Sequence, residues 1–297
     1  MRARFGNMAD MKFHCLCMSP AIDATVVLPR APRGAGEIFK DVSVVENVGG
    51  KGLNVARWLA LRGAEVSCGG LLGEGNDAPF RAELAQYGIH DCFRRVPGNT
   101  RRNEVITWPG GSYKLNQATF PHLSADACAD AEGLCGIGEL TSDDVVVLSG
   151  SLPKNCAADF YARVIAACRK RGIRTVLDTS GAALVAGFSA GPDVIKPNAE
   201  ECAVLTGFVP VTSEEFRLAT ARLKEKVAYP IISDGARGCW FDGTFVQASS
   251  VAVVDTTSAG DTLLAEWCWS GDPVRAVKAG SLTCAMPGSR PPDPHAL

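Results

Sequence analysis

The fold is decided by a strand–helix–strand stretch in the middle of the chain: DVVVLSG at 144–150, AADFYARVIAACRKRG at 157–172 and IRTVLD at 173–178. The first and last of these runs are short, apolar and rich in β-branched residues, as buried strands are. The middle run places apolar residues at helical spacing. A strand, a crossover helix and a second strand form a parallel pair, so this stretch predicts a parallel sheet covered by helices.

The same alternation extends in both directions from this stretch. A strand at VSCGGLLG (66–73) lies between two helical runs, LNVARWLALRG at 53–63 and APFRAELAQYG at 78–88. We also expect a polar helix near 124–139 and a buried strand, VAVVD (251–255), that leads into a further helix. The chain as a whole therefore predicts a three-layer α/β/α fold with a mostly parallel central sheet.

Two pieces of the chain, residues 20–48 and 100–117, are rich in strand signals but have no helix to cover them. Within the second piece, Pro109-Gly110-Gly111 separates two strand-like runs and predicts a hairpin. We expect the two pieces to form a small β lid over the carboxyl ends of the main strands, where ligands bind in such folds. Residues 1–10 are polar and are interpreted as an extension, which leaves 11–297 as a single domain with this lid.

Charge and composition exclude several classes of function. The chain has 297 residues, 30 Lys and Arg against 32 Asp and Glu, and a net charge of -2, so no overall basic field attracts nucleic acid or an anionic membrane. It shows neither a membrane-spanning apolar run nor a signal peptide, so we expect a cytoplasmic protein. The 12 cysteines include no C-x-x-C pair and are expected to be reduced thiols in the core.

The strongest local signal is VVDTTSAGDTLLAEW at 253–267, where small residues lead into a helix that opens at Ala259-Gly260-Asp261. Free backbone N–H groups and the positive end of the helix dipole make such a start a site for a phosphate or a developing oxyanion. An Asp at a helix start is also a routine cap. The small residues before it favour the ligand site, because they let a ligand approach the backbone closely.

A second glycine-rich turn, ENVGGKGLNVARWL at 46–59, also precedes a helix. It fails the phosphate-loop pattern because Lys51 is followed by glycine instead of Ser or Thr. Gly49 and Gly50 would let the backbone approach a sugar, with Lys51 and Asn54 as polar contacts. An ordinary strand-to-helix turn remains the alternative.

A third run, GEGNDA at 73–78, formally matches the dinucleotide fingerprint G-x-G-x-x-A and raises the alternative of a nicotinamide-dependent dehydrogenase. That fingerprint requires an acidic residue after the next strand to hold a ribose, but Asp91 comes before that strand. The dehydrogenase hypothesis is therefore disfavoured.

Several polar residues fall at predicted strand ends or on the lid pieces. They are Asp23, Arg101, and residues of GSLP at 150–153, IKPNAEE at 195–201 and ISDGARG at 232–238. Each one taken alone is more simply a solvated surface group. Their joint placement at one edge of a parallel sheet predicts a ligand site there.

From Cys15 to Gly288 the sequence resembles the ribokinase-like (PfkB) family of carbohydrate kinases. Two signatures carry the resemblance, GGKGLNVA at 49–56 and DTTSAGD at 255–261, far apart and in the right order. The runs SPAID, SGSLP and KPNAEE are most similar to the hexose-phosphate kinase branch, which includes 1-phosphofructokinase and tagatose-6-phosphate kinase. The resemblance implies a ribokinase-like fold with a β lid, transfer of the ATP γ-phosphate to a sugar-phosphate hydroxyl with Mg²⁺, and a homodimer formed through the lids.

The resemblance also assigns roles to single residues. Asp261 is the expected general base, beside the backbone amides of Ala259 and Gly260, which would stabilise the transferring phosphoryl group. The expected substrate-binding residues are Asp23, Gly49, Gly50, Lys51, Asn54, Arg101 and Ser151, with Lys40 contributed through the lid. The expected ATP-binding residues are Lys196, Asn198, Ser233, Gly235 and Gly238, and Asn198 and Glu201 would organise Mg²⁺ through water.

The chain departs from the family pattern at three places. Ser258 stands where the family has the first Gly of G-A-G-D, and Asn116-Gln117-Ala118-Thr119 replaces N-E-P-G on the lid. After Asp261 the chain is shorter than the family norm, with Glu266 and two tryptophans where small residues usually continue the helix. These departures keep two alternatives open: a kinase of an unphosphorylated sugar or nucleoside, and a weakened kinase that binds a sugar phosphate or nucleotide.

Overall fold

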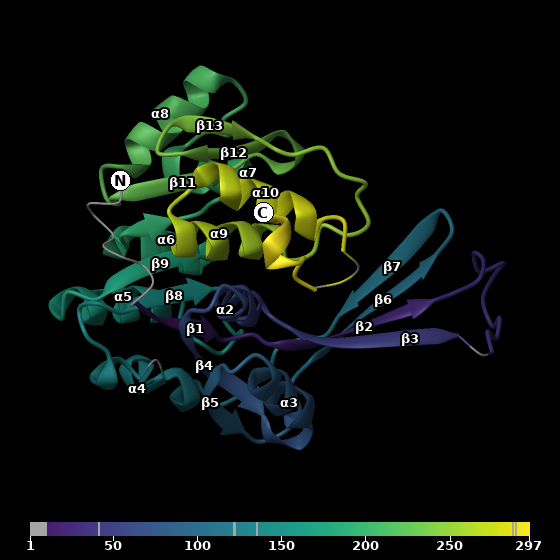
Figure 1. Cartoon of the computed structure of the whole chain (residues 1–297). Coiled ribbons are helices and arrows are strands. Elements are labelled where there is room, and N and C mark those ends of the chain that lie inside the picture. The colour runs from purple at the N-terminus through teal and green to yellow at the C-terminus, as the bar shows by residue number, and fades with distance from the viewer. Residues whose placement is uncertain (1–10, 41, 121–122, 135, 287, 289) are drawn as a thin grey trace.

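A nine-stranded sheet forms the middle layer of the computed structural model (Figure 1), which describes residues 11–40, 42–120, 123–134, 136–286, 288 and 290–297. In spatial order its strands are β5 (His90–Val96), β4 (Glu65–Gly73), β1 (Lys12–Cys17), β8 (Val145–Ser149), β9 (Arg174–Asp178), β10 (Val194–Ile195), β11 (Tyr229–Ser233), β12 (Gly238–Phe241) and β13 (Thr244–Gln247). Every pairing from β5 to β11 is parallel, whereas β12 pairs antiparallel with both β11 and β13 in this described sheet. The predicted mostly parallel sheet is confirmed.

Helices cover both faces of this sheet, so the predicted three-layer arrangement is also confirmed. One face carries α2 (Lys51–Leu61), α3 (Ala78–Gln86), α9 (Ala259–Ser270) and α10 (Pro273–Thr283), and the other carries α4 (Ala131–Leu134), α5 (Phe160–Lys170), α6 (Gly181–Ala190), α7 (Ala199–Thr206) and α8 (Ser213–Leu223). The buried strand β1 shows why two layers form: Phe13 and Cys15 join the first core, while Leu16 joins the second. None of the described helices is both long and apolar enough to cross a membrane.

A second sheet of four strands projects from the side of the molecule (Figure 1). Its order is β3 (Ser43–Gly49), β2 (Ala21–Val27), β6 (Arg102–Trp108) and β7 (Gly111–Asn116). The two β-rich pieces of the sequence thus meet, because β2 pairs with β6 in parallel along its whole length. The hairpin predicted at Pro109-Gly110-Gly111 joins β6 to β7.

The predicted buried strand VAVVD at 251–255 is wrong. These residues form no strand, and the side chains of Val253 and Val254 are 65% and 63% exposed. The backbone N–H groups of Val254 and Asp255 both donate to the carbonyl of Cys284, which follows α10. The β-branched pattern misleads here because these backbone groups bind the end of α10 instead of a neighbouring strand, and the valine side chains stay exposed.

The polar helix predicted near 124–139 is also wrong as a continuous element. The segment holds three short pieces instead: Ala125–Cys128, α4 at Ala131–Leu134, and Ile137–Glu139. Gly136 has φ +57°, a left-handed conformation that does not continue a helix. The predicted extension at residues 1–10 lies outside the described residues.

The cysteines behave as the composition predicts. None of the eleven cysteines in the described ranges forms a disulfide, and all of them except Cys92 and Cys284 are buried. They act as small apolar residues of the two cores.

Helix α2 packs directly against β1 because Gly52 has no side chain. A Cβ atom at this position would lie 2.3 Å from the carbonyl oxygen of Leu16 and 2.7 Å from its carbonyl carbon. This close approach places the start of α2, with Lys51 and Asn54, beside the carboxyl end of β1.

We expect Gly52→Ala to lower the free energy of unfolding by about 3 kcal/mol, because the helix or the strand must shift to admit the methyl group. Urea denaturation measures this change. The control is Gly34→Ala, since no atom lies within 4 Å of a Cβ built at Gly34 and its backbone is not left-handed. That control should change stability by less than about 0.5 kcal/mol, and equal effects of the two substitutions would contradict the packing argument.

Candidate active site

The candidate site lies at the carboxyl edge of the parallel sheet, where the sequence predicts it. Asp178 ends β9, Lys196 directly follows β10, and Ser233 ends β11. Helices α2 and α9 begin at Lys51 and Ala259 and pack against each other. Parallel strands bring all of these ends to one side, so residues far apart in the sequence meet.

A buried carboxylate lies between two lysines at this edge. Oδ1 of Asp178 is 3.2 Å from Nζ of Lys51, and Oδ2 is 3.1 Å from Nζ of Lys196. Burial by itself would raise the pKa of Asp178, but the charges of Lys196 and Lys51 hold it below its usual value. The charge of Asp178 in turn raises the pKa of Lys51.

Sequence reasoning missed Asp178. The signal available was its position at the end of the buried run IRTVLD, where side chains face a ligand site in such folds. An isolated carboxylate there is not distinguishable from a solvated strand end until the two lysines are placed beside it.

Asp261 contacts the first glycine-rich motif through Asn54. Nδ2 of Asn54 donates to Oδ2 of Asp261 at 2.8 Å, and both side chains are buried. Arg57 donates to Oδ1 of Asn54 at 3.4 Å, which directs the amide nitrogen toward Asp261. Burial raises the pKa of Asp261 to about 6, although the nearby charge of Lys51 opposes the shift. The two sequence signatures thus form one site around a carboxyl group that titrates near neutral pH.

The start of α9 offers fewer free amides than the sequence suggests. The N–H of Asp261 donates to the carbonyl of Ser258 at 3.0 Å, and that of Ala259 has a long contact of 3.4 Å with Thr256. The N–H of Gly260 makes no hydrogen bond within the described part of the chain. A Cβ at Gly260 would lie 3.5 Å from Nζ of Lys196, so an anion here would meet one free amide and one ammonium group.

Ser258 takes the backbone conformation that the usual glycine would take. Its φ of +61° and ψ of 0° are left-handed, which costs a non-glycine residue about 1 to 2 kcal/mol. The turn before α9 is therefore left-handed at Ser258 despite the serine side chain.

Two of the residues expected to bind the substrate, Asp23 and Arg101, come from the second sheet and its flank. Asp23 on β2 accepts a hydrogen bond of 2.8 Å from Nδ2 of Asn103 on β6. Arg101 precedes β6 and donates weakly, at 3.4 Å, to the carbonyls of Ser19 and Pro20. No carboxylate of the described residues forms an ion pair with Arg101, whose pKa is lowered by burial.

Lys51 and Arg101 contact different parts of the site. Lys51 is ion-paired with Asp178 on the Asp261 side of the site, whereas Arg101 lies against the loop after β1. The prediction that both cations face a sugar phosphate stays a prediction. Lys40 is exposed on the segment that joins β2 to β3.

Asn198 and Glu201 form a capping box at the start of α7. Oδ1 of Asn198 accepts from the N–H of Glu201 at 2.7 Å, and Oε2 of Glu201 accepts from the N–H of Asn198 at 2.9 Å. The backbones of Asn198 and Ser233 form an isolated parallel β-bridge, so these residues lie at the same edge of the sheet. No cluster of three or more His, Cys, Asp or Glu side chains suited to a metal occurs in the described residues. The expected contact of this pair with Mg²⁺ through water stays a prediction.

Two of the glycines predicted to bind ligands, Gly50 and Gly238, have packing roles in this structure. Gly50 has φ +123° and a Cβ there would lie 2.6 Å from Sγ of Cys17, so the turn of Gly49 and Gly50 fits tightly over β1. Gly238 opens the hairpin, and a Cβ there would lie 2.1 Å from the carbonyl oxygen of Val246. Gly235 and Ser151 lie in loops after β11 and β8, and Ser151 is exposed at the site edge.

The GEGNDA loop supports Arg101 instead of a dinucleotide. The Asn76 side chain donates to the carbonyl of Thr100 at 3.0 Å and accepts from its N–H at 2.7 Å. A Cβ at Gly73 would lie 2.3 Å from the nitrogen of Thr100. These contacts explain the glycine and the asparagine by packing, which removes the basis for the dehydrogenase hypothesis.

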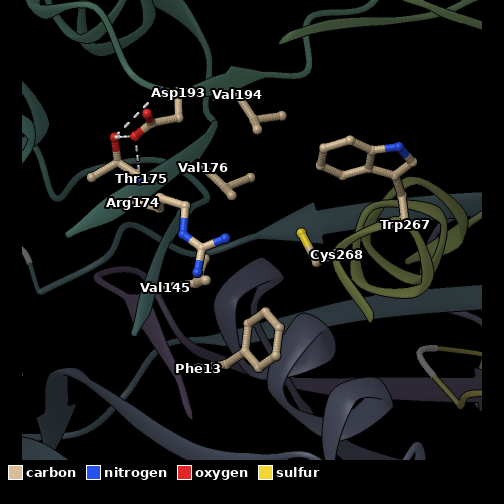
Figure 2. Close-up of a pocket in the computed structure, with 9 residues that line it drawn as sticks. All are labelled: Phe13, Val145, Arg174, Thr175, Val176, Asp193, Val194, Trp267 and Cys268. Atoms are coloured by element: carbon tan, nitrogen blue, oxygen red, sulfur yellow. Dashed lines mark hydrogen bonds between the residues drawn. The ribbon is translucent and has the colours of Figure 1, made fainter. Parts of the chain in front are cut away.

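A separate pocket lies at the opposite, amino-terminal edge of the sheet (Figure 2). Val145, Arg174 and Val194 begin β8, β9 and β10, and the pocket is closed by Trp267 and Cys268 near the end of α9. Apart from Arg174 and a Thr175–Asp193 pair, its lining is apolar. Trp267 and Cys268 follow Asp261 on α9 by about two helical turns, and Asp261 does not line the pocket, so this pocket is not the candidate site.

Comparisons with known proteins point to one family. A family model described as pfkB family carbohydrate kinase matches residues 18–286. The chain is 34% identical over 239 residues to 1-phosphofructokinase of Haemophilus influenzae, covering 76% of this chain and 75% of the relative. It is 33% identical over 261 residues to the 1-phosphofructokinase of Vibrio cholerae, covering 86% and 81%.

Solved structures show the same fold. Phosphofructokinase-2 from Escherichia coli in complex with potassium has a TM-score of 0.82 and 24% identity, over 95% of this chain and 94% of that chain. The same enzyme in complex with fructose-6-phosphate has a TM-score of 0.79, over 92% and 93%. The mixed α/β core with a small second sheet is thus shared with these kinases.

Asp261 should titrate near pH 6, so its ionisation should destabilise the fold. A carboxyl group with a folded pKa above its unfolded value contributes stability below pH 4 that is lost as the pH rises through about 6. We expect Asp261→Asn to raise the free energy of unfolding by about 3 kcal/mol at pH 8 and by little at pH 4. Urea denaturation at both pH values checks this, with the exposed Asp143→Asn as control. A carbon-13 carboxyl titration of Asp261 with a midpoint near 4 would contradict the prediction.

Proposed function

Because this chain belongs to the pfkB family of carbohydrate kinases, we propose that it transfers the γ-phosphoryl group of ATP to a hydroxyl of a phosphorylated ketohexose. The observation that carries the proposal is the contact of Asp261 with Asn54 beside the charges of Lys51 and Lys196. Relatives at 33–34% identity are named 1-phosphofructokinase, which favours a ketohexose phosphate as substrate.

Asp261 acts as the general base in this proposal. Its pKa of about 6 leaves most of the carboxylate ionised at neutral pH yet keeps it more basic than an exposed aspartate. The base accepts the proton of the attacking hydroxyl as the bond to phosphorus forms, and in a loose transition state the proton can leave late. The hydrogen bond from Asn54 holds the other side of the carboxylate in place.

The positive groups around Asp261 stabilise the transferring phosphoryl group. Gly260 supplies a free N–H at the start of α9, and Lys196 and Lys51 supply two ammonium groups. Asp178 fixes both lysines, so their charges are oriented before the substrate binds. This arrangement supports phosphoryl transfer at the carboxyl edge of the sheet.

ATP and Mg²⁺ are proposed as the donor and its metal. Ser233, Gly235 and Gly238 lie along β11 and the turn after it, on the Lys196 side of the site, where the ATP phosphates would bind. Glu201 fits a water-mediated magnesium site, because the capping box uses one carboxylate oxygen and the charge of Glu201 reaches Lys51. When bound, Mg²⁺ would neutralise charge on the phosphates.

The sugar phosphate is proposed to bind between the second sheet and the body of the molecule. Asp23 would accept hydrogen bonds from sugar hydroxyls, and Arg101 would bind the phosphate, because it forms no ion pair with any of the described carboxylates. The second sheet would serve as a lid that excludes water from the reaction.

The lid also supports a proposed homodimer. Its strands expose several large apolar side chains, namely Val27, Val44, Val45, Tyr113 and Leu115. Its edge strands β3 and β7 leave unpaired backbone groups in the described part of the chain. A second copy of the same sheet would cover both features.

The proposal predicts ADP release with a phosphorylated ketohexose and its loss on removal of the base. We expect turnover with fructose 1-phosphate, fructose 6-phosphate or tagatose 6-phosphate, and a fall in kcat of about 1000-fold or more in Asp261→Asn. A coupled ADP assay across these sugars and unphosphorylated ones measures both. Turnover that survives Asp261→Asn would reject the mechanism. Ligand binding in calorimetry without ADP release would favour the weakened binding protein instead.

Arg101→Ala should raise the KM for the sugar phosphate by about 10- to 100-fold, because a charge-assisted contact to the phosphate is lost. The KM for ATP should stay within about twofold. The matched control is Arg102→Ala, since Arg102 is already paired with Glu46 and Glu104 on the second sheet. An unchanged KM in Arg101→Ala would indicate a substrate without a phosphate.

A further inference from the structure

A fully buried carboxylate lies outside the site just described. Glu266 on α9 has no exposed surface and contacts three other side chains. Its Oε2 accepts a hydrogen bond of 2.9 Å from Nε1 of Trp58 and lies 3.1 Å from Nε of Arg62. Its Oε1 lies 3.2 Å from Nε of Arg275 on α10. The carboxylate thus joins α9 to both of its neighbouring helices.

Packing alone does not explain why a carboxylate, and not an apolar side chain, occupies the buried position of Glu266. A buried carboxylate costs several kcal/mol to desolvate, and an apolar side chain of similar volume often stabilises a fold as well or better. A fully paired buried charge is better suited to fixing one relative arrangement of helices, because its partners must meet it at defined distances. Glu266 meets that condition, since both oxygens have cationic partners.

The geometry relates Glu266 to the candidate base. Helices α2 and α9 are joined by polar contacts at two levels. Asn54 and Asp261 make the first, and Trp58 and Glu266 make the second. Trp58 follows Asn54 by one helical turn, and Glu266 follows Asp261 by slightly more than one turn. Two contacts a turn apart prevent α9 from sliding along α2 or rotating against it, which one contact cannot do.

We propose that Glu266 is a positioning residue for the Asn54–Asp261 pair: by tying α9 to Trp58 and Arg62 it holds the carboxyl group of Asp261 at hydrogen-bond distance from the Asn54 amide. The kinetic part of this inference rests on the proposed function. The position of Asp261 itself does not, because its titration is observable whether or not the chain phosphorylates a sugar.

The two roles that Glu266 can have predict opposite changes in the pKa of Asp261 when Glu266 is removed. The groups that act on Asp261 are Lys51, Asp178 and Lys196, together with the Asn54 amide, and the Asn54 hydrogen bond lowers its pKa. If Glu266 positions the pair, its loss weakens that bond and the pKa rises. If Glu266 acts only through its charge, its loss removes a nearby negative charge and the pKa falls.

The experiment is a carbon-13 carboxyl titration of Asp261 in the full-length wild type and in Glu266→Gln. We expect the midpoint to rise above the wild-type value, the acid limb of kcat/KM to move up with it, and kcat to fall about 10-fold with the sugar-phosphate KM within about twofold. An unchanged midpoint with a lowered melting temperature would overturn the proposal and leave a structural role. A lowered midpoint would overturn it in favour of a charge effect.

Two further variants test the contacts of Glu266 with α2 and with α10 separately. Trp58→Phe removes the hydrogen bond to Glu266 but keeps an aromatic ring, and it should shift the midpoint in the same direction by a smaller amount. It also serves as the test if Glu266→Gln does not fold. The control is Arg275→Gln, because Arg275 ties Glu266 to α10 and not to α2. It should lower the melting temperature without raising the midpoint, and an equal rise in this control would overturn the proposal.

Discussion

The site depends on the burial of Asp178 between the ammonium groups of Lys51 and Lys196. Two cations at a sheet edge would repel each other, and each would lose hydration there. The shared carboxylate removes that conflict and leaves one positive charge, which Asp261 balances when it ionises. With Asp261 ionised, the two lysines and the two aspartates are neutral together, and with Asp261 protonated they carry one positive charge. Because Lys51 begins α2 and Lys196 follows β10, the ion pairs also fix a helix to the sheet.

The same arrangement carries a cost in stability. Asp261 is buried deeply enough that its charged form is disfavoured, and Ser258 occupies a left-handed conformation that suits glycine. Both features lie at the start of α9, where the candidate chemistry takes place. The burial of apolar side chains in the two cores offsets this cost in folding free energy. The cores contain Leu53 and Trp58 on one side of the sheet and Phe160 and Phe216 on the other. Strain of this kind is expected at functional positions.

Much of the fold could be predicted from local pattern. Apolar runs such as 144–150 and 173–178 are buried strands because they lie in the middle of a parallel sheet that helices cover on both faces. A continuous apolar run is what such a position requires, so the pattern predicts these strands correctly. The run at 251–255 has the same composition but no strand beside it, so pattern alone placed it wrongly. The segment 124–139 failed for a different reason, since the left-handed conformation of Gly136 interrupts it.

The sequence by itself determined the family signatures and the position of Asp261 at the start of a helix, because these depend on residue type and short-range spacing. Only the tertiary structure decided which charges meet. It placed Asp178 between two lysines, directed Asn54 toward Asp261 and enclosed Glu266 among three helices. Three of these four contacts join residues more than a hundred positions apart, and their energies depend on burial and distance, which a linear pattern does not contain.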